Sequence, residues 1–132
     1  MKRVIFALLA ILLFGAIAAS AQTLTMPKDT TVILNTKTVN MTIKQPSTFD
    51  HATFQISLVR NSGTAAGTCK LQGSLNGVDW ADIGSSNTVT NVARQNFVHV
   101  VTAPSYLFYR YTCTGSGTMN VTPTALALFR KL

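Results

Sequence analysis

The chain has 132 residues, a length typical of one domain, and only 11% of them are charged. Eleven lysines and arginines stand against four aspartates, and glutamate is absent, so the net charge is +7. The basic residues are dispersed along the chain, whereas a nucleic-acid site usually shows a clustered basic stripe. Composition therefore argues against a nucleic-acid-binding protein. The shortage of long charged side chains and the abundance of Thr disfavour helix and favour strand.

Residues 1–21 have the pattern of a secretory signal peptide. Lys2-Arg3 forms a positive start, residues 4–18 are continuously apolar, and Ala19-Ser20-Ala21 supplies the small residues of a cleavage site. The apolar run is shorter than the roughly 20 residues of a comfortable membrane span. We expect a secreted or surface-associated domain of residues 22–132, with nine basic and four acidic residues. An uncleaved anchor is the alternative, and only then would the protein meet a membrane.

The mature chain predicts short strands separated by polar turns. Residues 22–29 are a polar lead-in, and apolar and polar residues then alternate with period two. Pro123 marks an edge, a bulge or a step between sheets, because proline cannot donate to a strand ladder. The expected strands outside the central hairpin are residues 30–35, 37–43, 52–60, 88–92, 95–101, 106–114 and 119–129. The expected loops and turns are residues 46–51, 61–63, 85–87, 104–105 and 115–117.

Residues 67–84 predict a hairpin at the centre of the chain. Cys69, Leu71 and Leu75 alternate with polar residues, as in a half-buried strand. Asn76-Gly77 then favours a tight type I′ turn, because both residues tolerate positive φ. Trp80 follows this turn, so we expect the only tryptophan to cover the core.

This succession of strands is typical of an all-β protein. The expected fold is an antiparallel β-sandwich, jelly-roll-like, with about eight strands and a hydrophobic signal helix in front of it. A compact barrel is the alternative. Period-two alternation predicts a core made of Val39, Met41, Phe54, Ile56, Leu58, Leu71, Leu75, Trp80, Ile83, Phe97 and Tyr109.

The two cysteines, Cys69 and Cys113, each lie on an expected strand in phase with apolar neighbours. In an exported protein such a pair indicates a disulfide bond. The bond would close a loop of about 45 residues and add about 3–4 kcal/mol in the chain-entropy model. Two buried free thiols are the alternative, and the lack of CxxC spacing argues against a metal site.

No pattern in the chain predicts catalysis. His51 and His99 are isolated, and the four aspartates show no acid–base spacing. Asp79 and Asp82 flank Trp80 and offer oxygen ligands to Ca²⁺, although capping of turns is the commoner role of aspartate there. Neither a nucleophile elbow nor a phosphate-binding loop is present. We therefore expect no enzymatic activity, no cofactor and no metal.

The strand at residues 106–114 carries large side chains on both faces. Tyr106, Phe108 and Arg110 share one face, while Tyr109 and Tyr111 share the other. One face must line the core, and the other is covered by a partner or exposed for binding. The candidate binding residues are Trp80, Tyr106, Phe108 and Arg110, as a sugar-stacking platform or a protein interface.

The run KLQGSLNGVDW at residues 70–80 resembles the LQGSxDGxxW hairpin of small β-sandwich modules. Such modules occur in phage virion proteins, among them head decorations, fibres and tail-associated domains, and in some bacterial surface proteins. A looser version of the pattern also occurs in discoidin-like carbohydrate-binding sandwiches. Asn76 stands where the pattern usually has Asp, and it suits the same turn. The resemblance implies a sandwich fold, and it implies function only by analogy.

Two functions follow from these observations. The first is a non-catalytic exported structural or adhesion module on a virion or cell surface, with protein partners or self-assembly. The second is a secreted carbohydrate-binding module that uses Trp80 and the tyrosines to hold a glycan.

Overall fold

The computed structural model describes residues 21–46 and 49–131, so the expected signal helix lies outside the described residues. Within them the chain forms nine strands: β1 (Ala21–Thr25), β2 (Ile33–Leu34), β3 (Thr38–Lys44), β4 (His51–Ser62), β5 (Ala66–Ser74), β6 (Ala81–Val89), β7 (Arg94–Thr102), β8 (Phe108–Ser116) and β9 (Asn120–Arg130). These segments contain no helix with the length and hydropathy of a membrane span.

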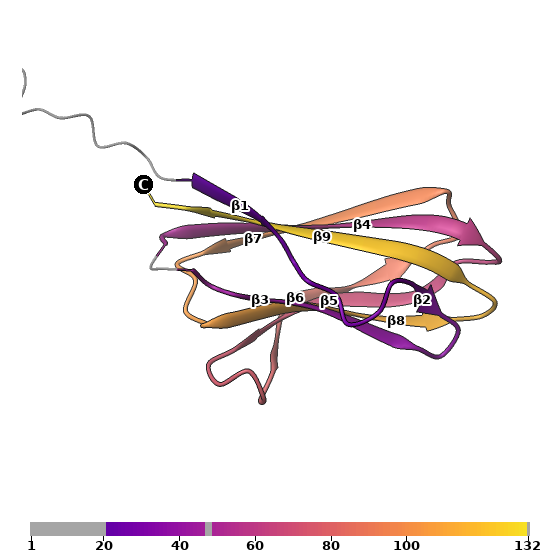
Figure 1. Cartoon of the computed structure of the whole chain (residues 1–132), viewed down its shortest axis with the longest axis horizontal. Coiled ribbons are helices and arrows are strands. Elements are labelled where there is room, and N and C mark those ends of the chain that lie inside the picture. The colour runs from indigo at the N-terminus through magenta and orange to yellow at the C-terminus, as the bar shows by residue number, and fades with distance from the viewer. Residues whose placement is uncertain (1–20, 47–48, 132) are drawn as a thin grey trace, which may run out of the picture.

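The strands form two antiparallel sheets that lie one above the other (Figure 1). Sheet A has the order β1-β9-β4-β7, with β2 also paired to β9, and sheet B has the order β3-β8-β5-β6. The pairs β1–β9, β3–β8, β4–β7 and β5–β6 form one long antiparallel ribbon, and rolling this ribbon places β4 beside β9 and β5 beside β8. The expected antiparallel sandwich is confirmed, and its strand order is that of a jelly roll.

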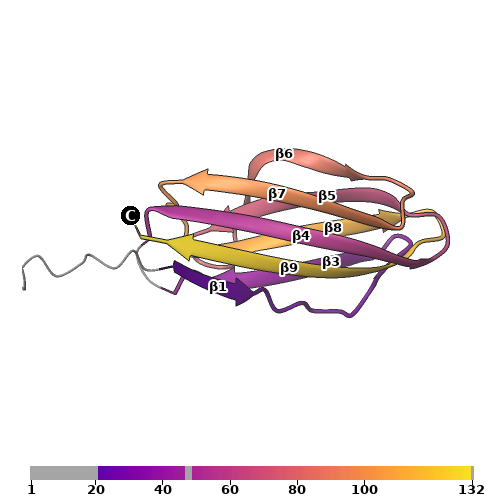
Figure 2. The ribbon, with the colours of Figure 1, turned by 90° about the horizontal axis from the view of Figure 1, so that it is seen from above.

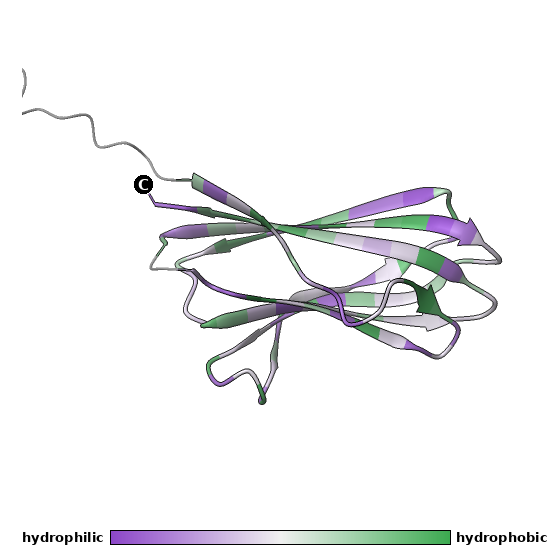
Figure 3. Cartoon of the chain, in the orientation of Figure 1, coloured by the Kyte–Doolittle hydropathy of each residue, from purple (hydrophilic) through white to green (hydrophobic). Residues whose placement is uncertain are grey.

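The core fills the space between the sheets. Buried residues alternate with more exposed ones along β3, β4 and β9. Figure 3 shows hydrophobic residues as green bands along the strands. Seven residues of the predicted core are buried, and Ile83 and Phe97 pack against it while partly buried. The seven are Val39, Met41, Phe54, Ile56, Leu58, Leu71 and Tyr109.

Two residues of the predicted core, Leu75 and Trp80, lie outside it. β5 ends at Ser74, so Leu75 stands in the following loop with 63% of its surface exposed. Trp80 is half-buried, but it belongs to the same loop and not to the core cluster. The reason is the length of this connection: the last pair of β5 and β6 is Gly73 with Ala81, so the expected two-residue turn is absent.

A buried hydroxyl is satisfied inside the core. The Tyr111 hydroxyl donates to the Phe54 carbonyl oxygen at 3.1 Å and lies 2.9 Å from His99 Nδ1. The Phe54 and Tyr109 rings also pack at 4.7 Å between centroids. These contacts join β4, β7 and β8, so aromatic side chains hold the two sheets together.

Further segments differ from the expectation, among them residues 90–92, which belong to no strand although residues 88–92 were expected to form one. The polar lead-in contains β1, which pairs with β9, and the expected strand at residues 30–35 shrinks to Ile33–Leu34. Residues 85–87 were expected to form a turn, but they lie within β6. The pairing of β6 with β5 shifts register between Cys69 and Leu71, and Gly84 has a positive φ, so the strand continues through this irregularity. Pro123 lies in β9. On the same side of β9, residues 120–121 pair with β2 and residues 126–130 pair with β1, so Pro123 stands between the two pairings, in agreement with the expected edge position.

Candidate functional site

The loop of residues 75–80 is held together by two polar side chains. Ser74 Oγ accepts hydrogen bonds from the Asn76 and Gly77 backbone N–H groups at 3.3 and 2.9 Å. Asn76 Oδ1 accepts from the Val78 and Asp79 N–H groups, both at 2.9 Å. These side chains take the place of a tight backbone turn. The loop projects from sheet B on the side away from sheet A, at the bottom of Figure 1.

This loop places Trp80 on the outer face of sheet B. The Arg110 guanidinium carbon lies 4.2 Å from the centroid of the Trp80 ring. In the same loop, Gly77 lies close to the Phe108 ring. A Cβ atom at this position would be 3.7 Å from the ring, an ordinary contact distance. Trp80 thus stacks on Arg110 and Gly77 lies near Phe108, so the loop rests on outward side chains of β8.

A row of polar side chains fixes Arg110. Arg110 Nε donates to Gln72 Oε1 at 2.7 Å, and Gln72 Nε2 donates to Asp82 Oδ1 at 2.6 Å. Lys70 Nζ lies 3.0 Å from Asp82 Oδ2. The hydrogen bonds from Gln72 and then from Lys70 lower the pKa of Asp82. Asp82 is therefore a charged acceptor engaged by its neighbours, as expected of a structural aspartate.

A groove of about 450 Å³ lies beside Trp80 and Arg110, and we name it the Trp80 groove. Asn40 supplies two donors that hold Asp29: its N–H reaches Oδ1 at 3.0 Å, and its Nδ2 reaches Oδ2 at 3.1 Å. Lys28 turns its ammonium group away, toward the carbonyl oxygens of Thr31 and Pro123. The groove is lined by Pro27, Lys28, Asp29, Asn40, Thr42, Gly77, Trp80 and Arg110.

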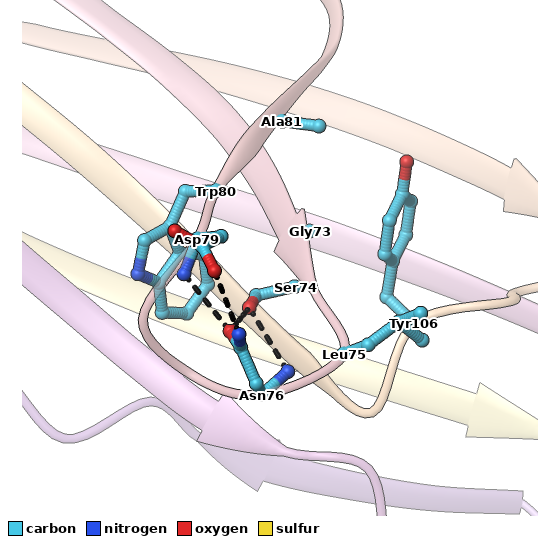
Figure 4. A pocket seen from close by; sticks show the side chains of 8 residues that line it. All are labelled: Gly73, Ser74, Leu75, Asn76, Asp79, Trp80, Ala81 and Tyr106. Carbon is cyan, nitrogen blue, oxygen red and sulfur yellow. Dashed lines mark hydrogen bonds between the residues drawn. The ribbon is translucent and has the colours of Figure 1, made fainter.

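A second depression, of about 350 Å³, borders Trp80 near Tyr106. The Tyr106 ring lies against Gly73, where a Cβ would overlap it, and meets the buried Tyr109 ring edge-on at 6.1 Å. Figure 4 shows Trp80 and Tyr106 on opposite sides of the end of β5. Tyr106 therefore does not share a face with Phe108 and Arg110. β8 begins only at Phe108, so strand alternation does not extend back to Tyr106.

Six of the eight groove residues were not predicted as site residues from the sequence, among them Asp29, Asn40 and Thr42. Asn40 and Thr42 occupy outward positions of β3, so strand alternation gave a weak signal for them. Asp29 comes from the segment before β2, which a bridge between Lys28 and Met41 brings beside β3. Only the tertiary fold places this carboxylate near Trp80.

His99 is packed between the sheets. Because the Tyr111 hydroxyl donates to a carbonyl, His99 Nδ1 acts as the donor to that hydroxyl, and Nε2 accepts from Asn87 Nδ2 at 3.2 Å. Burial lowers the pKa of His99, which favours the neutral ring. Among the described residues no three His, Cys, Asp or Glu side chains gather as a metal site would require.

No protein-family model and no curated protein matches this chain. Solved structures do resemble it. The mitogen derived from Yersinia pseudotuberculosis shares 14% identity over 84% of this chain and 86% of its own, with a TM-score of 0.51. The isomalto-dextranase of Arthrobacter globiformis T6, complexed with panose, shares 8% identity with a TM-score of 0.50. The match covers 80% of this chain and 23% of the isomalto-dextranase.

A family 16 carbohydrate-binding module is also similar, with 11% identity, a TM-score of 0.48, and coverage of 72% of this chain and 73% of the module. The likenesses to the mitogen and the isomalto-dextranase show the fold alone. Any function of this chain must therefore be argued from its own residues.

The Trp80 groove combines an aromatic surface with hydrogen-bonding groups of both kinds. Arg110 covers part of the indole, and Trp80 still borders both depressions. Arg110 offers donors, Asp29 offers acceptors, and the hydroxyl of Thr42 offers both. This combination suits a small polar ligand with a flat apolar face better than it suits a reaction.

Proposed function

We propose that this chain is a non-catalytic, exported adhesion module that binds a glycan in the Trp80 groove. The observation that carries the proposal is the position of Trp80, which stands outside the core on the outer face of sheet B, stacked on Arg110 and beside a polar groove. The binding roles of Trp80, Phe108 and Arg110 belong to this proposal. Tyr106 borders the neighbouring depression and is assigned no direct contact.

The physical case rests on the match between the groove and a sugar. A sugar ring has one flat face of C–H groups and a rim of hydroxyls that donate and accept hydrogen bonds. Indole rings supply large apolar contact area at low conformational cost, which makes tryptophan common in recognition sites. The pinned Asp29–Asn40 pair and the anchored Arg110 are preorganised, so binding would not need to order them.

Export belongs to the same proposal. Residues 1–21 act as a signal peptide, and residues 22–132 form the mature domain. The buried Cys69–Cys113 disulfide supports this compartment, because disulfides persist in oxidising surroundings and are rare in a reducing cytosol. The ligand then lies on a cell, a matrix or a host surface outside the producing cell.

The test is binding of the mature domain to a glycan array, followed by a titration with the sugar that binds best. Trp80→Ala should weaken that binding by about tenfold or more, equivalent to at least about 1.4 kcal/mol. Val78→Ala is the matched control, because Val78 lies in the same loop, is 76% exposed and lines neither depression. A folded domain that binds no glycan, or that binds equally well without Trp80, would refute the proposal.

A structural role in an assembly is the second candidate. The exposed apolar side chains of β7 favour it, since 58% of Val98 and 67% of Val100 are exposed to solvent. An ordered oligomer without glycan affinity would support this role over adhesion.

A further inference from the structure

The outer face of sheet A differs in chemistry from the outer face of sheet B. Figure 2 looks onto sheet A, where β1, β9, β4 and β7 lie side by side. Two rows of directly paired residues cross β9, β4 and β7, and neither row contains a charged residue. We name these six residues the uncharged face: Leu126, Gln55 and Val98 in one row, and Leu128, Thr53 and Val100 in the other.

Three of the four apolar residues of this face are exposed, and Leu128 is half-buried. Val98, Val100 and Leu126 expose 58%, 67% and 37% of their surface. In β1 the two rows continue with Thr25 and Thr23, so four strands share the same uncharged character. Polar Gln55 and Thr53 separate the leucines from the valines, but Val98 and Val100 are neighbours on β7, and exposed apolar side chains grouped in this way are a feature of interaction surfaces. The outer face of sheet B, in contrast, carries the Lys70–Asp82 ion pair and the Arg110 network.

We propose that a second copy of this chain docks on the uncharged face, sheet against sheet. The mature chain has nine basic and four acidic residues, so two copies repel each other at most orientations. An interface built from these two rows brings no charged side chain of one copy against one of the other. An acidic partner would find no basic residue within the face to pair with, and a basic partner would find no acidic one.

The size of the face predicts how tight the dimer is. Outward residues without charge run on from the two rows, from 96 to 102 of β7 and from 122 to 128 of β9, so with β4 and β1 they cover roughly 19 by 24 Å, or about 450 Å² on each copy. A standard interface buries about 800 Å² on each partner. The dimer is therefore weak and forms reversibly with concentration, with the two sheets about 10 Å apart.

The rim of the face adds a second signature. Arg130 stands next to the Leu128 row, whereas Asn96 separates Arg94 from the Val98 row. Each copy carries nine basic and four acidic residues, so two copies repel each other, and salt screens that repulsion. Association through this face therefore strengthens as the salt concentration rises, whereas association with an anionic partner weakens.

The sandwich places the uncharged face and the Trp80 loop on opposite sides of the molecule (Figure 1). A dimer through sheet A thus leaves both Trp80 grooves open and pointing away from each other. If the grooves bind a glycan, as proposed above, the dimer is a divalent adhesin and gains avidity on a repetitive surface. The dimer itself does not depend on that proposal.

The experiment is sedimentation equilibrium of the processed full chain over a range of protein concentrations, at low and at high salt. The wild type should show a monomer–dimer equilibrium whose association constant rises with salt. The Val98→Lys, Val100→Lys double variant should be monomeric at every concentration. Leu75→Lys is the matched control, because it adds the same charge at an equally exposed apolar residue on the other side of the sandwich, and it should dimerise like the wild type.

Three results would overturn the inference: a wild type that stays monomeric, a dimer that weakens with salt, or a folded double variant that still dimerises. Leu126→Lys provides a second, single charge on the face should the double variant fail to fold, and it should weaken dimerisation at least tenfold. Trp80→Ala separates this inference from the glycan proposal, because it should abolish glycan binding and leave the dimer unchanged.

Discussion

Cys69 and Cys113 stand directly opposite each other on the neighbouring antiparallel strands β5 and β8, with their Cα atoms 4.1 Å apart. Their disulfide, predicted from the sequence, links two strands of sheet B and does not cross between the layers. Both residues are at most 1% exposed, so the bond lies inside the core.

The first prediction is a large loss of stability without this bond. The cysteines are separated by 44 positions, and closing a loop of that size contributes about 4 kcal/mol in the chain-entropy model. The Cys69→Ser, Cys113→Ser double variant should therefore melt roughly 10–20 °C below the wild type. Thiol titration of the denatured, unreduced wild type should detect no free thiol. Two titratable thiols per chain would contradict the bond.

The second prediction compares two leucines of one predicted strand. Leu71 is fully buried and Leu75 is 63% exposed. Leu71→Ala should cost about 2–5 kcal/mol of unfolding free energy, because it leaves a cavity in the core. Leu75→Ala should cost less than about 0.5 kcal/mol, as is usual for a surface position. Denaturant unfolding of both variants measures the difference, and equal costs would place Leu75 in the core.

The third prediction concerns pH. Burial lowers the pKa of His99 below its ordinary value of 6.5. The unfolded chain then binds a proton more readily than the folded one, so stability is complete above about pH 6.5 and falls as the pH drops below it. Melting temperatures measured between about pH 7.5 and 5.5 should fall in the wild type. The decline should be smaller in His99→Gln, and an equal decline in both proteins would exclude His99 as its source.

The fourth prediction tests how the loop holds Trp80. Ser74 is buried and accepts two backbone hydrogen bonds, so Ser74→Ala leaves the Asn76 and Gly77 N–H groups without that acceptor. The loop should loosen, and quenching of Trp80 fluorescence by acrylamide should increase. Trp80 is the only tryptophan, so the signal reports this loop alone. Ser86→Ala, at an exposed site of β6, should quench like the wild type.

The fifth prediction concerns processing. The exported protein should have the intact mass of residues 22–132 with one disulfide, because residues 19–21 match a cleavage site. Mass spectrometry of protein recovered outside the cytoplasm decides this point. A mass that includes Met1 would mean that the leader is an anchor.

Period-two alternation predicted the central strands well because each of them buries one face. Val39 and Met41, and likewise Phe54 and Ile56, stand at alternate positions of strands whose other face is polar. The pattern weakens where a strand is short or polar. β1 was therefore missed, since its role depends on pairing with β9 at the far end of the chain.

The candidate site was harder to predict, for a local reason. Asn76-Gly77 is compatible with a tight turn, but the side chains of Ser74 and Asn76 bind the loop backbone and stabilise a longer connection. That difference moves Trp80 from the core to the outer face. Asp29 is brought to the groove only by the tertiary fold, so no spacing in the sequence reveals it.

The position of β9 has a consequence for biogenesis. It is the last of the described strands in chain order, and it lies between β1 and β4 in sheet A. Until residues 120–130 have left the ribosome, β1 has no strand to pair with and β4 lacks a neighbour on one side. We therefore expect nascent chains that end before Asn120 to be digested by protease, and only chains that include residues 120–130 to resist it. A domain that cannot close until β9 has been made stays unfolded while the preceding strands are synthesised, which suits the export proposed above.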